Sequence, residues 1–475
     1  MKAFLNIVFV VGVSTLFAQI NPVETHWIQN GLGHSSFKSH AFYEIDSLGK
    51  DSVSTFRFDA APDVLGAYQN NQFKVRTGAD LQIKANARQK LRMMASYRVG
   101  YTDQILLPYQ SVLQSKAYFN TDLNNGQTLY HDLRGRMVYE PNKYIQFQGG
   151  LDHLFIGEGD RSLLMGNQGI PAPFLSMRAK LWRLEYHFIQ QVWRENNKGS
   201  FSPKGNSAHY LSYKATKNWS ISFFESVVYD MRDTLYDRGI ELEYLNPFIF
   251  FRPQEYGIGS TDNVIIGLQT SFQWKKNMIY GQVVLDEFFL AEIKARNRWW
   301  ANKYGFQLGY KTSFQRNLSE YFIRSEFNLV RPFTYSQINP NSVYGNQYLP
   351  TAHPLGAGFL EFYQEVSIKR NKWNVSAWGQ LYLKGLDTLY SNVAFGGDIY
   401  KPYTQRPEEY NFKIGGGITY HAIQVGIHVS RRVFSNWDVF VEPRFILGNT
   451  EGNILNKSAL TVGIHRSIGS DRRNY

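Results

Sequence analysis

Residues 157–177, GEGDRSLLMGNQGIPAPFLSM, bring together the components of an anion-binding loop: paired glycines, an acid, an arginine and a serine. A phosphate loop needs a strand before it and a helix amino terminus after it, because the helix amides and dipole hold the anion. The alternating residues 144–157 predict the strand. Pro171 and Pro173 exclude the helix, since proline removes a backbone donor and clashes with the preceding turn. We therefore interpret the segment as a structured loop or a binding loop and reject a nucleotide site.

Small and charged side chains in this segment are suited to holding a loop in place. The candidates for a structural or functional role are Gly157, Gly159, Asp160, Arg161, Ser162 and Asn167. Gly157 and Gly159 are expected to allow the bend at the strand end. Asp160 and Arg161 are predicted to form a buried ion pair, so that the loop folds inward and is pinned there.

No motif of a common enzyme is present. The sequence lacks H-E-x-x-H, G-x-S-x-G and a P-loop, and it has no cysteine for thiol catalysis or metal binding. Its 11 histidines are scattered without a ligand spacing. Asp286 and Glu287 are adjacent, and adjacent strand residues face opposite ways, so they would not share a site. We expect no catalytic residue, metal or cofactor; the alternative is a barrel-embedded lipase or protease with a dispersed triad.

The elements that position these residues are predicted to be β-strands, because apolar and polar residues alternate. Phe73, Val75, Leu81 and Ile83 alternate with polar residues across 73–86. The same alternation occurs in residues 373–384, 423–430, 437–445 and 460–465. Many such segments run about 9–13 residues, which suits tilted strands that cross a bilayer.

A closed barrel is the architecture that these strands predict. Residues 1–18 have a basic start, a short apolar run and small residues, which are typical of a secretory signal peptide. After it no run of 18 apolar residues occurs. A chain that spans lipid without apolar helices must be a closed barrel, because every backbone polar group needs a partner. We predict an all-β, antiparallel transmembrane barrel of roughly 16–18 strands as one domain, 19–475, with short turns at one end and long loops at the other. A secreted multi-sheet protein is the alternative.

The charge of the chain bears on its partners. The formal net charge is +12, and aromatic residues make up 16% of the sequence. A basic surface binds nucleic acid, anionic lipid or acidic polysaccharide, and export makes nucleic acid the least suitable of the three. We expect outer-membrane lipid or lipopolysaccharide and an anionic surface polysaccharide as partners. The alternative is that the charges only line a wet lumen.

Residues 157–177 also resemble a signature of the Wzi-like capsule-assembly outer-membrane proteins in their Bacteroidetes-type form. The shared features are Gly-x-Gly, Arg-Ser-Leu-Leu, an asparagine and Pro-Phe-Leu, whereas Asp160 stands where the family often has an aromatic residue. Further similar segments are residues 244–268, 280–290, 299–309, 330–336 and 353–361. The resemblance implies an outer-membrane barrel of about 18 strands, occluded by internal loops or short helices. It implies a lectin-like role in anchoring or assembling capsular polysaccharide. The gliding-motility branch, typified by RemB, implies motility or adhesion instead, and a diffusion porin is a lesser alternative.

A glycan would be held by aromatic rings that stack on sugar faces and by charged groups that fix hydroxyls or carboxylates. Residues 294–304 and 330–348 are rich in both kinds of side chain. The candidate glycan contacts are Arg298, Trp299, Trp300, Arg331 and Tyr335. The favoured alternative for the two tryptophans is the aromatic girdle at the membrane interface.

Overall fold

The structure is a computed structural model of the whole chain. The structure describes residues 37–38, 54–69, 72–87, 90–103, 121–122, 127–167, 169–197, 200–232, 239, 241–246, 262–387, 392–434, 437–450 and 453–466. The predicted signal peptide, residues 1–18, lies outside these residues.

A closed antiparallel barrel of 18 strands forms the wall, which confirms the predicted fold. The ring closes where Tyr68 of β2 pairs with Leu460 of β23. The wall strands are β2 (Thr55–Gln69), β3 (Gln72–Ala87), β4 (Leu91–Asp103), β6 (Gln127–Tyr139), β7 (Ile145–Asp152), β9 (Ala172–Leu181), β10 (Leu184–Asn197), β11 (Ser200–Lys214), β12 (Trp219–Asp230), β13 (Asn263–Trp274), β14 (Asn277–Glu287), β15 (Lys303–Arg316), β16 (Ser319–Val330), β19 (Phe359–Arg370), β20 (Trp373–Leu386), β21 (Ile418–Phe434), β22 (Trp437–Thr450) and β23 (Asn453–Arg466).

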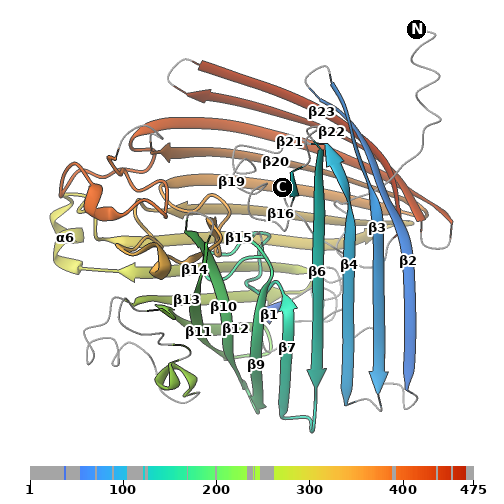
Figure 1. Cartoon of the computed structure of the whole chain (residues 1–475), viewed down its shortest axis with the longest axis horizontal. Helices are drawn as coiled ribbons and strands as arrows, with labels where there is room; N and C mark the ends of the chain where they lie inside the picture. Colours follow the sequence, from blue (N-terminus) through green and yellow to red (C-terminus); the bar gives the residue numbers. More distant parts are fainter. Residues whose placement is uncertain are drawn as a thin grey trace.

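The two ends of the barrel differ in the length of their connections, as predicted. At one end all wall strands are joined by short turns, and two of these turns begin at Asn317 and Asn371 with φ of 54° and 53°. Asparagine tolerates this left-handed conformation, which tight hairpins require. All long connections lie at the other end, where the α6 loop and the β20–β21 connection appear together at the left of Figure 1.

Short helices occur only in the long connections among the described residues. They are η2 (Leu242–Leu245), α6 (Leu290–Ala295), η3 (Pro340–Ser342) and η4 (Tyr403–Gln405). None of the described helices is long and apolar enough to cross a membrane.

The distribution of polarity across the wall is the reverse of that in a water-soluble protein. On β13 the outward side chains of Leu268 and Phe272 are 51% and 47% exposed, whereas the inward Gln269 and Ser271 are 3% and 1% exposed. Apolar residues outside and polar residues inside are typical of a barrel whose outer face meets lipid. The alternation predicted for residues 373–384 has this orientation, because Leu381 faces outward and Ser376 is fully buried inside.

One part of the outer wall departs from this rule. Tyr244 of η2 packs on the outward ring of Tyr229, with centroids 5.0 Å apart, and its carbonyl accepts a bond from Gln190 Nε2 at 2.7 Å. Nearby, the paired residues His209 and Glu225 also face outward and are buried. The β12–β13 connection therefore contributes cover to a polar stretch of outer wall, which the sequence pattern did not reveal.

Connections between wall strands fold into the lumen and form part of its core. The plug segment, residues 153–167, follows β7 and forms most of the connection to β9. It includes β8 (Phe155–Ile156), which pairs with β1 (Phe37–Lys38). The β16–β19 connection contributes the pair β17 (Gly345–Asn346) and β18 (Leu349–Pro350). A further short strand, β5 (Thr121–Asp122), pairs with β6. Buried residues of the plug segment, of the β16–β19 and β20–β21 connections and of wall strands β9–β14, β16 and β19–β21 form one apolar cluster, so the lumen is packed along this part of the wall.

Candidate functional site

The plug segment is held through its backbone by inward side chains of the wall. Glu326 on β16 is 1% exposed, and its carboxylate accepts bonds from the amide of Asp160 and, at 3.2 Å, from that of Arg161. The hydroxyl of Tyr280 donates to the same carboxylate at 2.8 Å. A buried acceptor with three donors is a strong anchor, because each donor would otherwise lose its partner in the interior.

Neighbouring strands supply three more anchors at inward positions. Gln282 on β14 accepts from the amide of Leu163 at 2.8 Å, and Gln307 on β15 donates to the carbonyl of Arg161 at 3.0 Å. Lys311 on β15 donates to the carbonyl of Glu158 at 2.7 Å. The polar face that each strand turns to the lumen thus replaces the hydrogen bonds that regular structure would give the plug backbone.

Ser162 organises the turn inside the plug segment. Its hydroxyl donates to the carbonyl of Ile156 and accepts from the amides of Leu164 and Met165 at 3.1 Å and 3.2 Å. The amide of Ile156 in turn donates to the carbonyl of Met165 at 2.9 Å. This role of Ser162 is structural.

A buried ionic network surrounds Asp160 and Arg161, and it contains the predicted pair. Asp160 Oδ2 lies 3.2 Å from Arg161 Nη1, and its other oxygen lies 3.3 Å from Arg324. Arg324 also contacts Glu365 at 2.5 Å, and Arg161 Nε lies 3.9 Å from Glu361. Burying charges is costly unless partners and hydrogen bonds compensate, so such a network favours one register of the plug over others.

The two glycines of the plug segment are needed for room. Neither is among the described glycines with positive φ, so left-handed backbone does not explain them. A Cβ on Gly159 would lie 2.8 Å from Glu326 Oε1 and 2.8 Å from the carbonyl of Arg161. A Cβ on Gly157 would lie 3.0 Å from Gln282 Nε2. The two glycines therefore let the segment approach its wall anchors closely. Asn167, the remaining candidate of this segment, lies half-buried at its end.

Tyrosines of the β16–β19 connection fasten the plug from the other side. Tyr335 and Tyr344 are fully buried, and their hydroxyls donate to the carbonyls of Leu163 and Leu164 at 2.7 Å and 2.8 Å. Burial raises the pKa of Tyr335 well above its ordinary value, so its hydroxyl stays a donor. The expectation that Tyr335 contacts a glycan is wrong for this conformation, because no part of its side chain is accessible.

The other glycan candidates lie in a cluster of loops at the long-loop end. Trp300 is 9% exposed, stacks on Tyr403 with centroids 4.7 Å apart and donates from Nε1 to Glu409 at 2.8 Å. It packs among loop residues, so it is neither an open sugar platform nor part of a lipid-facing girdle. Arg331 is half-buried and donates to the carbonyl of Trp299 at 3.0 Å, which positions that turn.

Arg298 and Trp299 remain accessible at this end. Arg298 is exposed, and Trp299 is half-buried against Trp300 and Phe289. Arg406 lies over the Trp300 ring, with its guanidinium carbon 4.2 Å from the centroid. Cations and aromatic rings therefore share this surface, which we name the cap: the accessible residues of 288–302 and 400–413.

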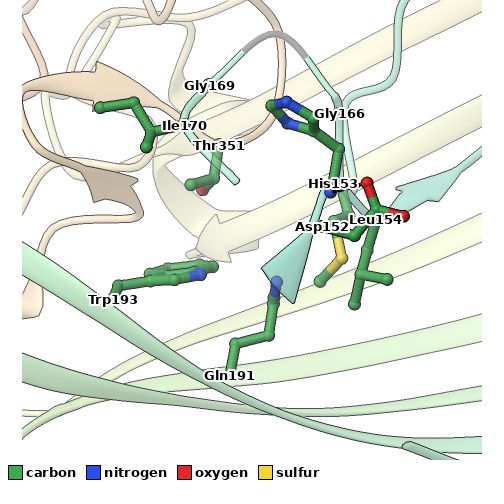
Figure 2. Close-up of a pocket in the computed structure, with 10 residues that line it drawn as sticks. Asp152, His153, Leu154, Gly166, Gly169, Ile170, Gln191, Trp193 and Thr351 are labelled. Atoms are coloured by element: carbon green, nitrogen blue, oxygen red, sulfur yellow. Dashed lines mark hydrogen bonds between the residues drawn. The ribbon is translucent and has the colours of Figure 1, made fainter. Parts of the chain in front are cut away.

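A small cavity lies between the plug segment and β10. Figure 2 shows Gln191 and Trp193 on one side, with His153, Leu154 and Gly166 of the plug segment on the other. Its volume of about 20 Å³ holds a water molecule and excludes a sugar ring. The cavity is a gap in the packing around the plug.

The described residues contain no cluster of His, Cys, Asp and Glu that could hold a metal ion. Asp286 and Glu287 serve separate purposes: Asp286 accepts from the amide of Tyr335 at 2.7 Å, and Glu287 lies 2.9 Å from Lys303 Nζ. Both carboxylates nevertheless attract Lys303, and the register of β14 shifts between Leu285 and Glu287, so simple alternation does not separate the two residues.

The fold and the plug segment define the class: a barrel with a membrane-facing wall and a segment pinned inside it. Among solved structures, the chain is similar to Wzi of Escherichia coli, described as a carbohydrate-binding outer-membrane barrel involved in group 1 capsule assembly, with a TM-score of 0.55 and 12% identity. That match covers 98% of this chain and 96% of Wzi. Pseudomonas aeruginosa OprD matches with a TM-score of 0.44 and 10% identity over 87% of this chain and 94% of OprD. Acinetobacter baumannii OccAB4 matches with a TM-score of 0.43 and 8% identity over 88% of this chain and 99% of OccAB4. No family model and no curated protein sequence matches the chain. These likenesses show the fold.

Proposed function

We propose that the protein is an outer-membrane barrel that binds surface polysaccharide without enzymatic action, and so anchors or helps to assemble a capsule. The observation that carries the proposal is the plug segment fixed inside the lumen. The plug segment makes buried contacts to Glu326, Gln282, Gln307 and Lys311, which is the construction of a fixed internal structure. A barrel built in this way is better suited to presenting a surface than to passing solutes.

The orientation follows from the ends of the barrel. In bacterial outer-membrane barrels short turns face the periplasm and long loops face the outside. By this rule the cap lies on the cell surface, where polysaccharide is found. The full-length likeness to a carbohydrate-binding barrel supports the same assignment.

The cap offers the chemistry that an acidic polysaccharide requires. Arg296 and Arg298 are exposed, Trp299 is half-buried, and Tyr410 is 43% exposed. Guanidinium groups bind carboxylates through charge-assisted hydrogen bonds, and aromatic rings offer a face for stacking. We therefore place the polysaccharide contact on Arg298 and Trp299, with Arg331 holding the turn beneath them.

Deletion of the gene tests this function in the cell. Loss of cell-attached capsule, with polymer shed into the medium, supports anchoring, and restoration by the wild-type chain but not by R298Q/W299L would place the contact on the cap. An intact capsule with lost surface spreading would contradict anchoring and would favour a motility component.

Conductance separates the proposal from a diffusion porin. The pinned plug predicts little current through the purified protein in planar bilayers. Large, steady open-channel currents would contradict an occluded barrel.

A further inference from the structure

Trp378 on β20 differs from the other aromatic residues that line the described inner wall beside glycines. It faces the lumen at the position paired with Gly426 on β21. A Cβ on Gly426 would lie 2.6 Å from Trp378 Cε2 and 2.7 Å from Cζ2, so the indole occupies the space that a side chain at this position would need. The packing of a ring on a strand glycine by itself is a common way to support a sheet.

The exposure of the ring sets Trp378 apart. Tyr280 lies over Gly309 in the same manner and is 1% exposed, and Tyr420 lies over Gly448 and is 4% exposed. Trp378 remains partly exposed. Two rings of this kind are sealed by neighbours, whereas the indole keeps accessible surface inside the barrel.

An oriented arginine lies over the ring. Arg444 on β22 pairs with Gly426 from the other side, and its guanidinium carbon is 5.8 Å from the Trp378 ring centroid. Its Nε donates to Glu442, whose second oxygen lies 3.0 Å from His428 Nδ1. The Arg444 side chain is nevertheless 20% exposed, so it is fixed in direction and still reachable from the lumen.

The adjoining inner wall adds positive charge. Ala459 on β23 pairs with Arg444, and Lys457 lies two residues away on the same face. Across the barrel closure, Lys74 and Arg76 of β3 face inward as well. All three cationic side chains are half-buried, whereas Arg324 and Lys311, on the packed side of the lumen, are 0% exposed. The packed cluster therefore reaches round to inner residues of β20 and β21, and the wall from β22 to β3 retains accessible basic residues.

We propose that Trp378 and Arg444 form a saccharide subsite on the inner wall, which binds an acidic sugar residue of the uronate type. The sugar stacks its C–H face on the indole, and its carboxylate accepts hydrogen bonds from Arg444. Lys457 and Lys74 supply further attraction for a short anionic oligosaccharide. This inference rests on the proposed function, and it adds a second contact for the polymer, separate from the cap.

Binding of trigalacturonate to the purified full-length chain tests the subsite by calorimetry at low salt, with neutral maltotriose as the comparison. W378L and R444Q should each weaken trigalacturonate binding about tenfold, since each removes one stacking or charged contact. W373L is the matched control, because Trp373 lies on the same strand, faces outward and is 48% exposed. Unchanged affinity in both W378L and R444Q would overturn the subsite.

Accessibility of the inner wall is tested independently, because the chain has no cysteine. A459C should react with a water-soluble, negatively charged thiosulfonate and should be protected by trigalacturonate. A377C, whose side chain faces outward toward lipid, is the control for non-specific reaction. An unreactive A459C in a folded, heat-modifiable barrel would overturn the proposal.

The two proposals fail in different ways. If the wild-type chain binds its cell-surface polysaccharide and the W378L and R444Q variants bind it equally well, the inner subsite is wrong and the proposed function stands. If the wild-type chain binds neither that polysaccharide nor trigalacturonate, the proposed function is wrong.

Discussion

Replacing Glu326 with leucine is expected to release the plug segment from the wall while the strand ladder stays intact. The carboxylate accepts bonds from two plug amides, those of Asp160 and Arg161, and from the Tyr280 hydroxyl. A buried donor without a partner costs about 1–3 kcal/mol, so the two unpaired amides alone should destabilise the docked plug segment by roughly 2–6 kcal/mol. The lower figure corresponds to about 30-fold faster local opening, since 1.4 kcal/mol is a factor of ten.

Hydrogen–deuterium exchange of the purified full-length chain measures this opening directly. Peptides that cover residues 157–166 should exchange at least about 30-fold faster in E326L, whereas peptides from β16 and β19 should change little. E326Q should lie between wild type and E326L, because its amide retains one acceptor oxygen. E320Q, on the inward face of the same strand, is the control. Exchange of residues 157–166 within about threefold of wild type in E326L would refute the assigned anchor.

Three further perturbations address the same assembly. Y335F removes the bond to the carbonyl of Leu163 at 2.7 Å and should accelerate plug exchange about tenfold, which corresponds to a buried hydrogen bond of about 1–2 kcal/mol; an unchanged rate would contradict that role. G159A should lower the thermal unfolding midpoint of the plug, because its Cβ would lie 2.8 Å from Glu326 Oε1, and an unaltered midpoint would show that the segment has room. Burial lowers the pKa of His353 below its ordinary 6.5, against the opposing contact with Glu361. As the pH falls, His353 takes up a proton more readily in the released loop than in the folded one, so acid favours release. Protection of residues 349–358 from hydrogen exchange should therefore be complete above pH 6.5 and decrease below it. H353Q should flatten this pH dependence, and a flat profile in the wild type would contradict it.

The barrel could be predicted from the sequence because its signal is repeated along the chain. Each strand of the type seen at residues 373–384 places apolar residues on the lipid side and polar residues on the lumen side, and this alternation is local. Strand length and the absence of long apolar runs then point to closure. The two ends could be distinguished as well, since the length of a connection is visible in the sequence.

The anchors of the plug segment could not be predicted, because they depend on register across distant strands. Glu326 and Gln282 look like any other inward polar residue of an alternating strand, and nothing local indicates which of them meets residues 160–163. The Asp160–Arg161 pair was predictable because the two residues are adjacent. The second ion pair of the Asp160 carboxylate, with Arg324 on a distant strand, was not.

Two of the glycan candidates, Trp300 and Tyr335, failed for a related reason. Composition identified Trp300 and Tyr335 as aromatic residues in polar loops, which suits either a binding surface or a packed core. Only the three-dimensional fold distinguishes these, and it buries both of them. Conversely, Trp378 stands at a lumen-facing position of a regular strand, where the alternation indicated its direction but not its exposure.

The central claim, that this barrel binds surface polysaccharide without cleaving it, is tested most directly with the purified full-length protein and the capsular polysaccharide of its own cells. Biolayer interferometry in detergent should show saturable binding that weakens as salt is raised, and the polymer should keep its length after prolonged incubation. R298Q/W299L should bind more weakly than wild type. No binding at low salt, or progressive shortening of the polymer, would contradict the account.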